Sequence, residues 1–123
     1  MIIIDTNVLV ASLVEEEEDH EKALALLQEA ERSGEEQYLT YGALIELSKV
    51  LYREKGSEFS ASYVKYAIEF FKILKLDSLP AIAELYFRTH KTLSFVDCEI
   101  IALARENGAS ILTFDGKLLK AVK

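Results

Sequence analysis

The apolar residues of this chain fall into two patterns, short continuous runs and longer stretches with apolar positions three or four residues apart. Short runs are typical of strands buried in a sheet, and the wider spacing predicts helices with one apolar face. The runs predict strands at residues 1–4, 37–41 and 110–114, with a further short strand at 74–76. The spacing predicts helices at residues 19–33, 42–53, 57–74, 80–88 and 94–107. Because predicted strands alternate with helices, we expect an α/β fold, a three-layer α/β/α sandwich around a mostly parallel sheet.

Length and composition indicate one domain over residues 1–123. A chain of this size can bury roughly two thirds of its unfolded surface, which is enough for a proper core. Half of the residues are hydrophobic, 28% are charged and one is proline, as is typical of a folded globular protein. No apolar run approaches the ~18 residues of a membrane span, so we expect no membrane contact. The single cysteine, Cys98, cannot form an internal disulfide, so we expect a cytoplasmic protein.

The net charge of −7 argues against strong binding of nucleic acid through bulk electrostatics, because that attraction comes from lysine and arginine. Any contact with nucleic acid has to be local and assisted by a metal ion. The densest basic stretch without acids comprises Lys117, Lys120 and Lys123. These lysines either contact phosphates or lie in a solvated C-terminal turn, and the sequence leaves both interpretations open.

Four acidic residues lie beside or within apolar segments. Asp5 directly follows the first apolar run and Asp115 directly follows the last one, while Glu46 and Asp97 lie inside predicted helices. A carboxylate at the border of a core is unfavourable unless it is hydrogen-bonded, paired or bound to a cation. Four such groups in a small domain therefore suggest one shared site for a hard divalent metal ion.

Each acid also has an ordinary structural interpretation when it is taken alone. Asp5 can cap the short helix that follows it, and Asp97 can form a capping box with Ser94. Asp115 and the glycine after it form a common turn dipeptide. Glu46 can be an acid at the edge of the apolar face of a helix. A single acid therefore does not identify a site.

The four acids together favour the metal-site interpretation. Asp5 and Asp115 both follow predicted strands, and ligands of open parallel sheets bind at the carboxyl ends of the strands. Asp97 shares a helix face with Ile100 and Ile101, so it points toward the packed side. Clustered carboxylates repel one another and raise each other's pKa values, whereas Mg²⁺ or Mn²⁺ holds them ionised. Such a metal ion polarises a phosphoryl oxygen and activates water, which is the chemistry of phosphodiester hydrolysis.

At these residues the chain resembles the PIN domain family, and particularly the VapC-type toxins of prokaryotic toxin–antitoxin pairs. The matching motifs are Ile3-Ile4-Asp5-Thr6-Asn7, Glu46 after the second strand, Leu93-Ser94-Phe95-Val96-Asp97 and Thr113-Phe114-Asp115. The ordered set covers nearly the whole chain and is specific, although each motif alone is weak. Many relatives have a further strand, whereas little sequence follows residues 117–119, so we expect this edge of the sheet to differ.

The resemblance implies an Mg²⁺- or Mn²⁺-dependent endoribonuclease that leaves 5′-phosphate and 3′-hydroxyl ends on its RNA substrate. The catalytic and metal-binding acids of the family correspond to Asp5, Glu46, Asp97 and Asp115. Its supporting polar groups correspond to Thr6, Asn7 and Thr113. The resemblance also implies a homodimer and an antitoxin that covers the acidic cleft with a cationic side chain.

The remaining candidates have simpler interpretations. Glu99 lies about 200° around the helix from Asp97, which favours a solvated acid or an outer-shell role over a direct metal ligand. His20 and His90 lack a second histidine or cysteine at ligand spacing, so we expect both at the surface. Cys98 is expected to be a small packed residue. The aromatic residues of the predicted helix at 57–74 share one face, which favours a core position over a partner surface.

Other functions fit the sequence less well. A phosphatase of the haloacid dehalogenase type needs a second acid two residues after Asp5, and that position is Asn7. A receiver-type signalling domain needs an acidic pair near the first strand, where only Asp5 is present. Within the family resemblance, a stand-alone RNA-processing nuclease and a non-catalytic protein-binding module remain as alternatives.

Overall fold

The sheet at the centre of the protein has four parallel strands in the order β3-β2-β1-β4. The computed structural model describes residues 1–75 and 77–122. Its strands are β1 (Ile2–Ile4), β2 (Gln37–Thr40), β3 (Lys72–Leu74) and β4 (Ser110–Leu112). Ile3 of the central strand β1 is paired with Tyr38 on one side and with Ile111 on the other. The expected α/β fold with a parallel sheet is confirmed.

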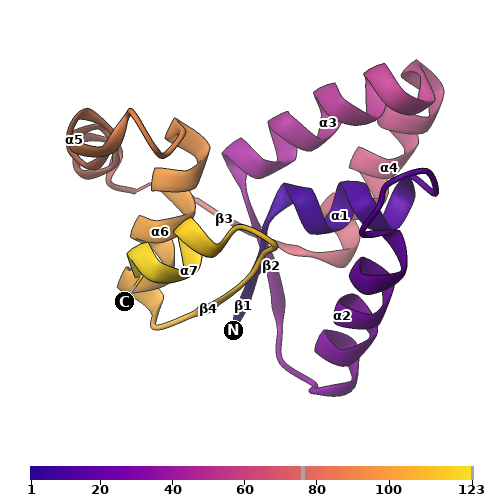
Figure 1. Ribbon diagram of the computed structural model, residues 1–123, viewed down its shortest axis with the longest axis horizontal. Coiled ribbons are helices and arrows are strands. Elements are labelled where there is room, and N and C mark those ends of the chain that lie inside the picture. Colours follow the sequence, from indigo (N-terminus) through magenta and orange to yellow (C-terminus); the bar gives the residue numbers. More distant parts are fainter. Residues whose placement is uncertain (76, 123) are drawn as a thin grey trace.

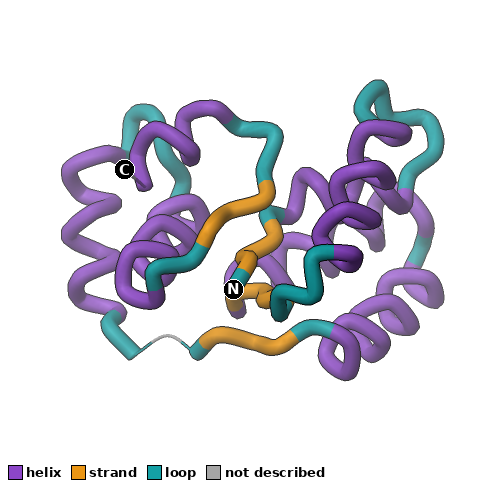
Figure 2. Tube along the Cα trace, turned by 90° about the horizontal axis from the view of Figure 1, so that it is seen from below, coloured by secondary structure: helices purple, strands orange, loops and turns teal. Residues whose placement is uncertain are grey.

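Helices cover both faces of this sheet (Figure 1). They are α1 (Thr6–Leu13), α2 (His20–Arg32), α3 (Tyr41–Lys55), α4 (Ser57–Phe70), α5 (Leu79–Thr89), α6 (Phe95–Asn107) and α7 (Gly116–Val122). Helices α1 to α4 lie on one side of the strands and α5 to α7 lie on the other (Figures 1 and 2). No helix in the described ranges is both long enough and apolar enough to span a membrane.

The three isoleucines of β1 join the cores on the two sides of the sheet. Ile2 and Ile4 pack in the cluster formed with α1, α2, α3 and α4, while Ile3 packs against α6. All three side chains are buried. A parallel strand covered on both faces has to be apolar at every position, which explains why the chain begins with a continuous apolar run.

Helix α6 is packed on two sides. Ile100 and Leu103 face the sheet, whereas Cys98 and Ile101 belong to a third cluster that α6 forms with α5 and α7. The helix ends at Gly108, whose φ of 61° is the left-handed conformation that favours glycine. The expected helix over residues 94–107 and the packed position of Cys98 agree with this arrangement.

Three predicted elements have wrong boundaries. The helix expected over 57–74 ends at Phe70, because the buried Phe71 adopts an extended conformation and Lys72–Leu74 pairs with β2 as β3. The expected strand at 74–76 therefore ends at residue 74, and Leu76 lies outside the described residues. The strand expected over 110–114 ends at Leu112, because the backbone turns there toward α7.

The aromatic face of α4 is mostly not part of the core. Phe59, Tyr66 and Phe70 are 37%, 49% and 47% exposed, so the core interpretation is wrong for these three residues. Tyr63 of the same helix is half-buried and packs against the core, and Phe71 is buried. Phe59, Tyr63, Tyr66 and Phe70 stack in sequence along the helix, so they partly cover one another instead of being covered by another element.

Candidate active site

Asp5 lies at the carboxyl end of β1, and its side chain faces β4 instead of capping α1. The residue is 6% exposed. The Thr113 hydroxyl donates a hydrogen bond of 2.6 Å to Asp5 Oδ2. Asp5 occupies the N-cap position of α1, as predicted, but within the described residues its side chain makes no capping hydrogen bond to that helix. The hydrogen bond from Thr113 engages Oδ2, and the Thr6 backbone N–H also interacts with this carboxylate.

Thr113 connects the ends of β1 and β4. Its hydroxyl oxygen accepts hydrogen bonds from Asn7 Nδ2, at 3.4 Å, and from the Asp115 backbone N–H, at 3.0 Å. The Phe114 N–H in turn donates to Asn7 Oδ1 at 3.4 Å. Two of the three predicted supporting groups therefore hold Asp5 and Asp115 next to each other. The third, Thr6, is buried and donates to the Ala43 carbonyl at the start of α3.

Asp115 caps α7 instead of forming the predicted turn, and within the described residues one of its carboxylate oxygens has no hydrogen bond. Its Oδ1 accepts a hydrogen bond of 2.9 Å from the Lys117 N–H, which opens α7. Lys117 and Lys120 are exposed, and Lys123 lies outside the described residues.

Asp97 forms the predicted capping box with Ser94. The Ser94 N–H donates to Asp97 Oδ2 at 2.9 Å, and the Asp97 N–H donates to Ser94 Oγ at 3.1 Å. The box occupies Oδ2 and leaves Oδ1 without a hydrogen bond in the described part of the chain. The structural interpretation and the metal-ligand interpretation of Asp97 are therefore compatible.

Glu46 projects from α3 toward the other acids. It lies near the Thr6 hydroxyl, and its carboxyl group is partly desolvated although the residue as a whole is exposed. This desolvation, together with the charges of Asp5 and Asp97, raises the pKa of Glu46 above its ordinary value, whereas the hydrogen bond from Thr6 lowers it.

The electrostatics show that the four acids form one group. Burial raises the pKa of Asp5, the hydrogen bond from Thr113 lowers it, and the charges of Asp97 and Asp115 raise it further. Each of the four carboxylates therefore influences at least one other, although the residues are far apart in the sequence. Among residues 1–75 and 77–122, no three His, Cys, Asp or Glu side chains are close enough to hold a metal ion directly. The spacing instead suits an ion that keeps several waters and takes one or two carboxylates, as Mg²⁺ does.

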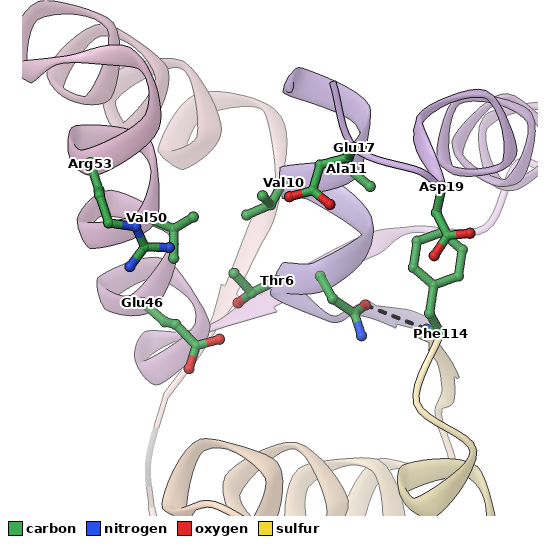
Figure 3. A pocket seen from close by; sticks show the side chains of 10 residues that line it. Thr6, Val10, Ala11, Glu17, Asp19, Glu46, Val50, Arg53 and Phe114 are labelled. Carbon is green, nitrogen blue, oxygen red and sulfur yellow. Dashed lines mark hydrogen bonds between the residues drawn. The ribbon is translucent and has the colours of Figure 1, made fainter. Parts of the chain in front are cut away.

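A cleft of about 390 Å³ opens beside this group. Its lining includes Thr6, Asn7, Glu46, Arg53 and Phe114. Figure 3 shows Glu46 and Arg53 on α3 at one side of the cleft and Phe114 at the other. Figure 3 shows the Arg53 guanidinium group directed toward the Glu46 side of the cleft. Arg53 is the one cation among the described lining residues, so the cleft offers a phosphate partner next to acids.

Glu99 is not the solvated acid that its helical position suggested. It is 2% exposed, and both carboxylate oxygens accept hydrogen bonds from the Gly42 N–H, at 3.0 and 3.3 Å. Burial raises the pKa of Glu99, whereas the hydrogen bonds from Thr40 and Gly42 lower it. The sequence signal that was missed is Gly42 itself, a glycine in the first turn of a helix where the backbone is approached closely.

The two histidines differ in their surroundings. His90 is exposed, as expected. His20 is half-buried, and its Nδ1 lies 2.7 Å from the Ala11 carbonyl oxygen, where the protonated nitrogen donates to the C-terminal part of α1. The surface interpretation of His20 is therefore only partly right.

The fold and the gathered carboxylates together define a PIN-like α/β protein. The family model of the PIN domain matches residues 2–123, and the chain belongs to the PIN domain family. PIN domains are nucleases, so the chain lies within a nuclease family. No curated protein matches the chain in sequence.

Two solved structures share this fold. VapC20 from Mycobacterium tuberculosis, described as a sarcin-ricin loop cleaving toxin, is similar with a TM-score of 0.77 and 19% identity, over 98% of this chain and 95% of that chain. PAE2754 from Pyrobaculum aerophilum has a TM-score of 0.70 and 16% identity, over 99% of this chain and 84% of that chain. The predicted resemblance to PIN domains of the VapC type is confirmed at the level of family and fold.

Proposed function

We propose that this protein, as a single nuclease domain, is an Mg²⁺- or Mn²⁺-dependent endoribonuclease in which Asp5, Glu46, Asp97 and Asp115 form the active site. The observation that carries the proposal is the electrostatic coupling of these four carboxylates at one edge of a parallel sheet. Like charges held together are unfavourable in the absence of a cation, and a divalent metal ion removes this repulsion.

The donor set fits a hard divalent ion. Asp97 and Asp115 each have one oxygen engaged by the protein and one oxygen free of hydrogen bonds in the described residues, and Asp5 has Oδ2 engaged by Thr113. The engaged oxygens fix the side-chain orientations, and the free oxygens are the ones that would hold the ion. When bound, the ion supplies Lewis acidity toward a phosphoryl oxygen and lowers the pKa of a water molecule.

Glu46 has the properties of a general base. Its raised pKa places its proton affinity closer to neutrality than that of an ordinary glutamate. Its carboxylate lines the cleft, where it accepts a proton from the attacking water.

RNA fits the cleft through local contacts. Glu46 stands between the 390 Å³ cleft and a second hollow of about 300 Å³ that Gly42, Lys49 and Val96 help to line. Arg53 lines the first hollow and Lys49 lines the second, so each hollow beside the proposed base holds one cation of α3. Phosphates next to the scissile bond bind these two cations, which overcomes the unfavourable net charge of the protein where contact occurs.

The cellular role that we propose is that of a VapC-type toxin in the cytoplasm. Support comes from the fold shared with VapC20 and from the match to the PIN family. In this role the protein forms a homodimer, and an antitoxin neutralises it by placing a cationic side chain among the four carboxylates. A stand-alone RNA-processing nuclease with the same chemistry is the alternative, and a gene for a DNA-binding antitoxin beside this one would favour the toxin.

Cleavage assays with purified protein test the proposal. The substrates are a sarcin-ricin loop hairpin, because VapC20 is described as cleaving that loop, and an unstructured RNA of equal length. We expect cleavage with Mg²⁺ or Mn²⁺, products with 5′-phosphate ends, and no cleavage in EDTA or with Ca²⁺ alone. Cleavage that persists in EDTA would exclude the metal mechanism, and the absence of cleavage on every RNA would support the non-catalytic alternative.

A further inference from the structure

Glu99 connects α6 to the first turn of α3. It lies two residues after Asp97, and Gly42 lies four residues before Glu46. The Glu99 carboxylate accepts the Gly42 N–H and the hydroxyl hydrogen of Thr40, while the Thr40 oxygen accepts the Ala43 N–H at 3.1 Å. The helix that carries Glu46 is therefore bonded at its first turn to the helix that carries Asp97.

The contact requires a glycine at position 42. A Cβ atom there would lie 2.5 Å from Glu99 Oε1 and 3.2 Å from Val96 Cγ2. The first distance is far below van der Waals contact, so the backbone of α3 and the carboxylate of Glu99 meet only because the side chain is missing. Glycine is otherwise unfavourable in a helix. Its presence at position 42 is therefore explained by the close contact between the backbone of α3 and the Glu99 carboxylate.

We propose that Glu99 is a positioning residue that sets the placement of Glu46 relative to Asp97. This inference rests on the proposed nuclease function, because it assigns Glu99 a role in the geometry of that site. The hydrogen bond to Gly42 fixes the distance and the rotation of α3 against α6, and Glu46 follows one helical turn later. Glu99 itself is bonded to Thr40 and Gly42 and does not reach substrate.

A purely packing role does not explain a carboxylate at this position. A buried acid is unfavourable compared with an apolar side chain of similar volume, and the α6 positions beside it, Cys98 and Ile100, are apolar. A carboxylate adds directional bonding to N–H and O–H donors at the start of a helix, where backbone N–H groups lack helical partners. Directional bonds define a relative position more sharply than apolar contact does.

The test compares two substitutions of Glu99. Glu99→Met keeps the length of the side chain but cannot replace the bond to Gly42, whereas the amide oxygen of Glu99→Gln can accept it. We expect Glu99→Met to bind Mn²⁺ roughly tenfold more weakly in calorimetry without RNA, and to lose roughly a hundredfold in kcat. We expect KM for RNA to change by less than about threefold, and Glu99→Gln to stay within about threefold of the wild type in every measurement.

Ser60→Ala is the matched control for lost stability. The Ser60 hydroxyl, which is buried, donates a hydrogen bond of 2.7 Å to the Ser48 carbonyl and so ties α4 to α3 away from the acids. Its removal lowers the melting temperature without touching the first turn of α3. Glu99→Met and Ser60→Ala are compared at temperatures where both are fully folded in EDTA. We expect Ser60→Ala to keep the Mn²⁺ affinity and kcat of the wild type.

Gly42→Ala is a second way to break the hydrogen bond between Glu99 and residue 42. The added Cβ pushes the Glu99 carboxylate away, so we expect Gly42→Ala to resemble Glu99→Met. Because both changes break one contact, the double variant Gly42→Ala/Glu99→Met should lose much less than the sum of the single effects. If Glu99→Met does not fold, the Mn²⁺ affinity and kcat of Gly42→Ala are compared with those of Glu99→Gln and Ser60→Ala instead.

The outcomes separate this inference from the proposed function. If the wild type binds Mn²⁺ but cleaves no RNA, the nuclease proposal fails, and the Mn²⁺ affinities still decide the role of Glu99. A wild type that binds no Mn²⁺ overturns the positioning role, because there is then no ion-binding geometry to set. Wild-type affinity and kcat in Glu99→Met, or losses no larger than those of Ser60→Ala, would also overturn it.

Discussion

Two carboxylates are buried at the carboxyl edge of the same sheet, and their neighbours differ. Asp5, after β1, accepts one hydrogen bond from Thr113 and faces the charges of Asp97 and Asp115. Glu99, behind the end of β2, accepts hydrogen bonds from Gly42 and Thr40. No acid within the described residues contributes to the raised pKa of Glu99.

This difference distinguishes Asp5, which we propose to be a metal ligand, from Glu99, which is hydrogen-bonded to the backbone of α3. Burial is similar at the two residues, at 6% and 2% exposed, so burial alone does not distinguish them. The number of donors and the presence of other acids do distinguish them. A carboxylate with a free oxygen and acidic neighbours is relieved by a metal ion, whereas one surrounded by donors is already satisfied.

The largest expected effect comes from making the same chemical change at both acids. Asp5→Asn and Glu99→Gln each replace a carboxylate by an amide that still accepts a hydrogen bond. We expect Asp5→Asn to lose roughly a hundred- to thousandfold or more of the cleavage rate in Mn²⁺, because a ligand charge disappears. Glu99→Gln should lose little. Equal losses in the two variants, measured as initial cleavage rates, would show that the distinction between the acids is false.

A second comparison separates the two roles of Asp97. Asp97→Ala and Ser94→Ala both break the capping box, so each should cost about 1 kcal/mol of stability in denaturant unfolding. Only Asp97→Ala removes a carboxylate from the acidic group, which offsets part of its cost in metal-free protein. We expect Ser94→Ala to cleave RNA nearly as well as the wild type and Asp97→Ala to be inactive. Retained cleavage in Asp97→Ala would leave this acid with the capping role alone.

A smaller effect is expected at the edge of the cleft. Arg53→Gln removes a cation that lines the cleft, whereas Arg88→Gln removes an exposed cation of α5 that pairs with Glu84. We expect Arg53→Gln to raise KM for RNA roughly tenfold with little change in kcat, and to reduce the salt dependence of binding by about one counterion. Arg88→Gln is the control. If Arg53→Gln and Arg88→Gln change KM for RNA and its salt dependence by the same amount, RNA does not bind along this cleft.

The smallest effect is a dependence of stability on pH in metal-free protein. The folded-state pKa of Asp5 is raised above its ordinary value of 3.8, so this group stabilises the fold below that value. The contribution is lost as the pH rises through the raised pKa. We expect the melting temperature of Asp5→Asn in EDTA to exceed that of the wild type by a few degrees at pH 7. This difference in melting temperature should narrow toward pH 4. A difference that widens toward low pH would contradict the raised pKa of Asp5.

The order of the elements could be predicted from the sequence because strand runs and helical spacing are local signals. The acids after β1 and β4 could be predicted for the same reason, since parallel strands end at one edge. Thr113 and Asn7 were assigned by resemblance, and the structure shows a hydrogen bond between them and one from Thr113 to Asp5.

Glu99 and the aromatic residues of α4 could not be placed from the sequence. Helical spacing shows which residues share a face, but not which other element covers that face. Glu99 was assigned to solvent or to an outer-shell role because it lies away from Asp97, whereas α6 is covered by the sheet, by α5 and α7, and by the first turn of α3. Phe59 and Phe70 were assigned to the core, but their side chains are 37% and 47% exposed.

The pairing of β1 with β4 also sets when the protein becomes active during its synthesis. Asp5 and its hydrogen-bond partner Thr113 are 108 residues apart in the sequence. A ribosome therefore exposes β1 long before it has made the strand that completes the acidic group. Contacts between such distant segments also form slowly. Under the proposed function, a nascent chain cannot cleave RNA until the segment that contains β4 and Asp115 has emerged and docked.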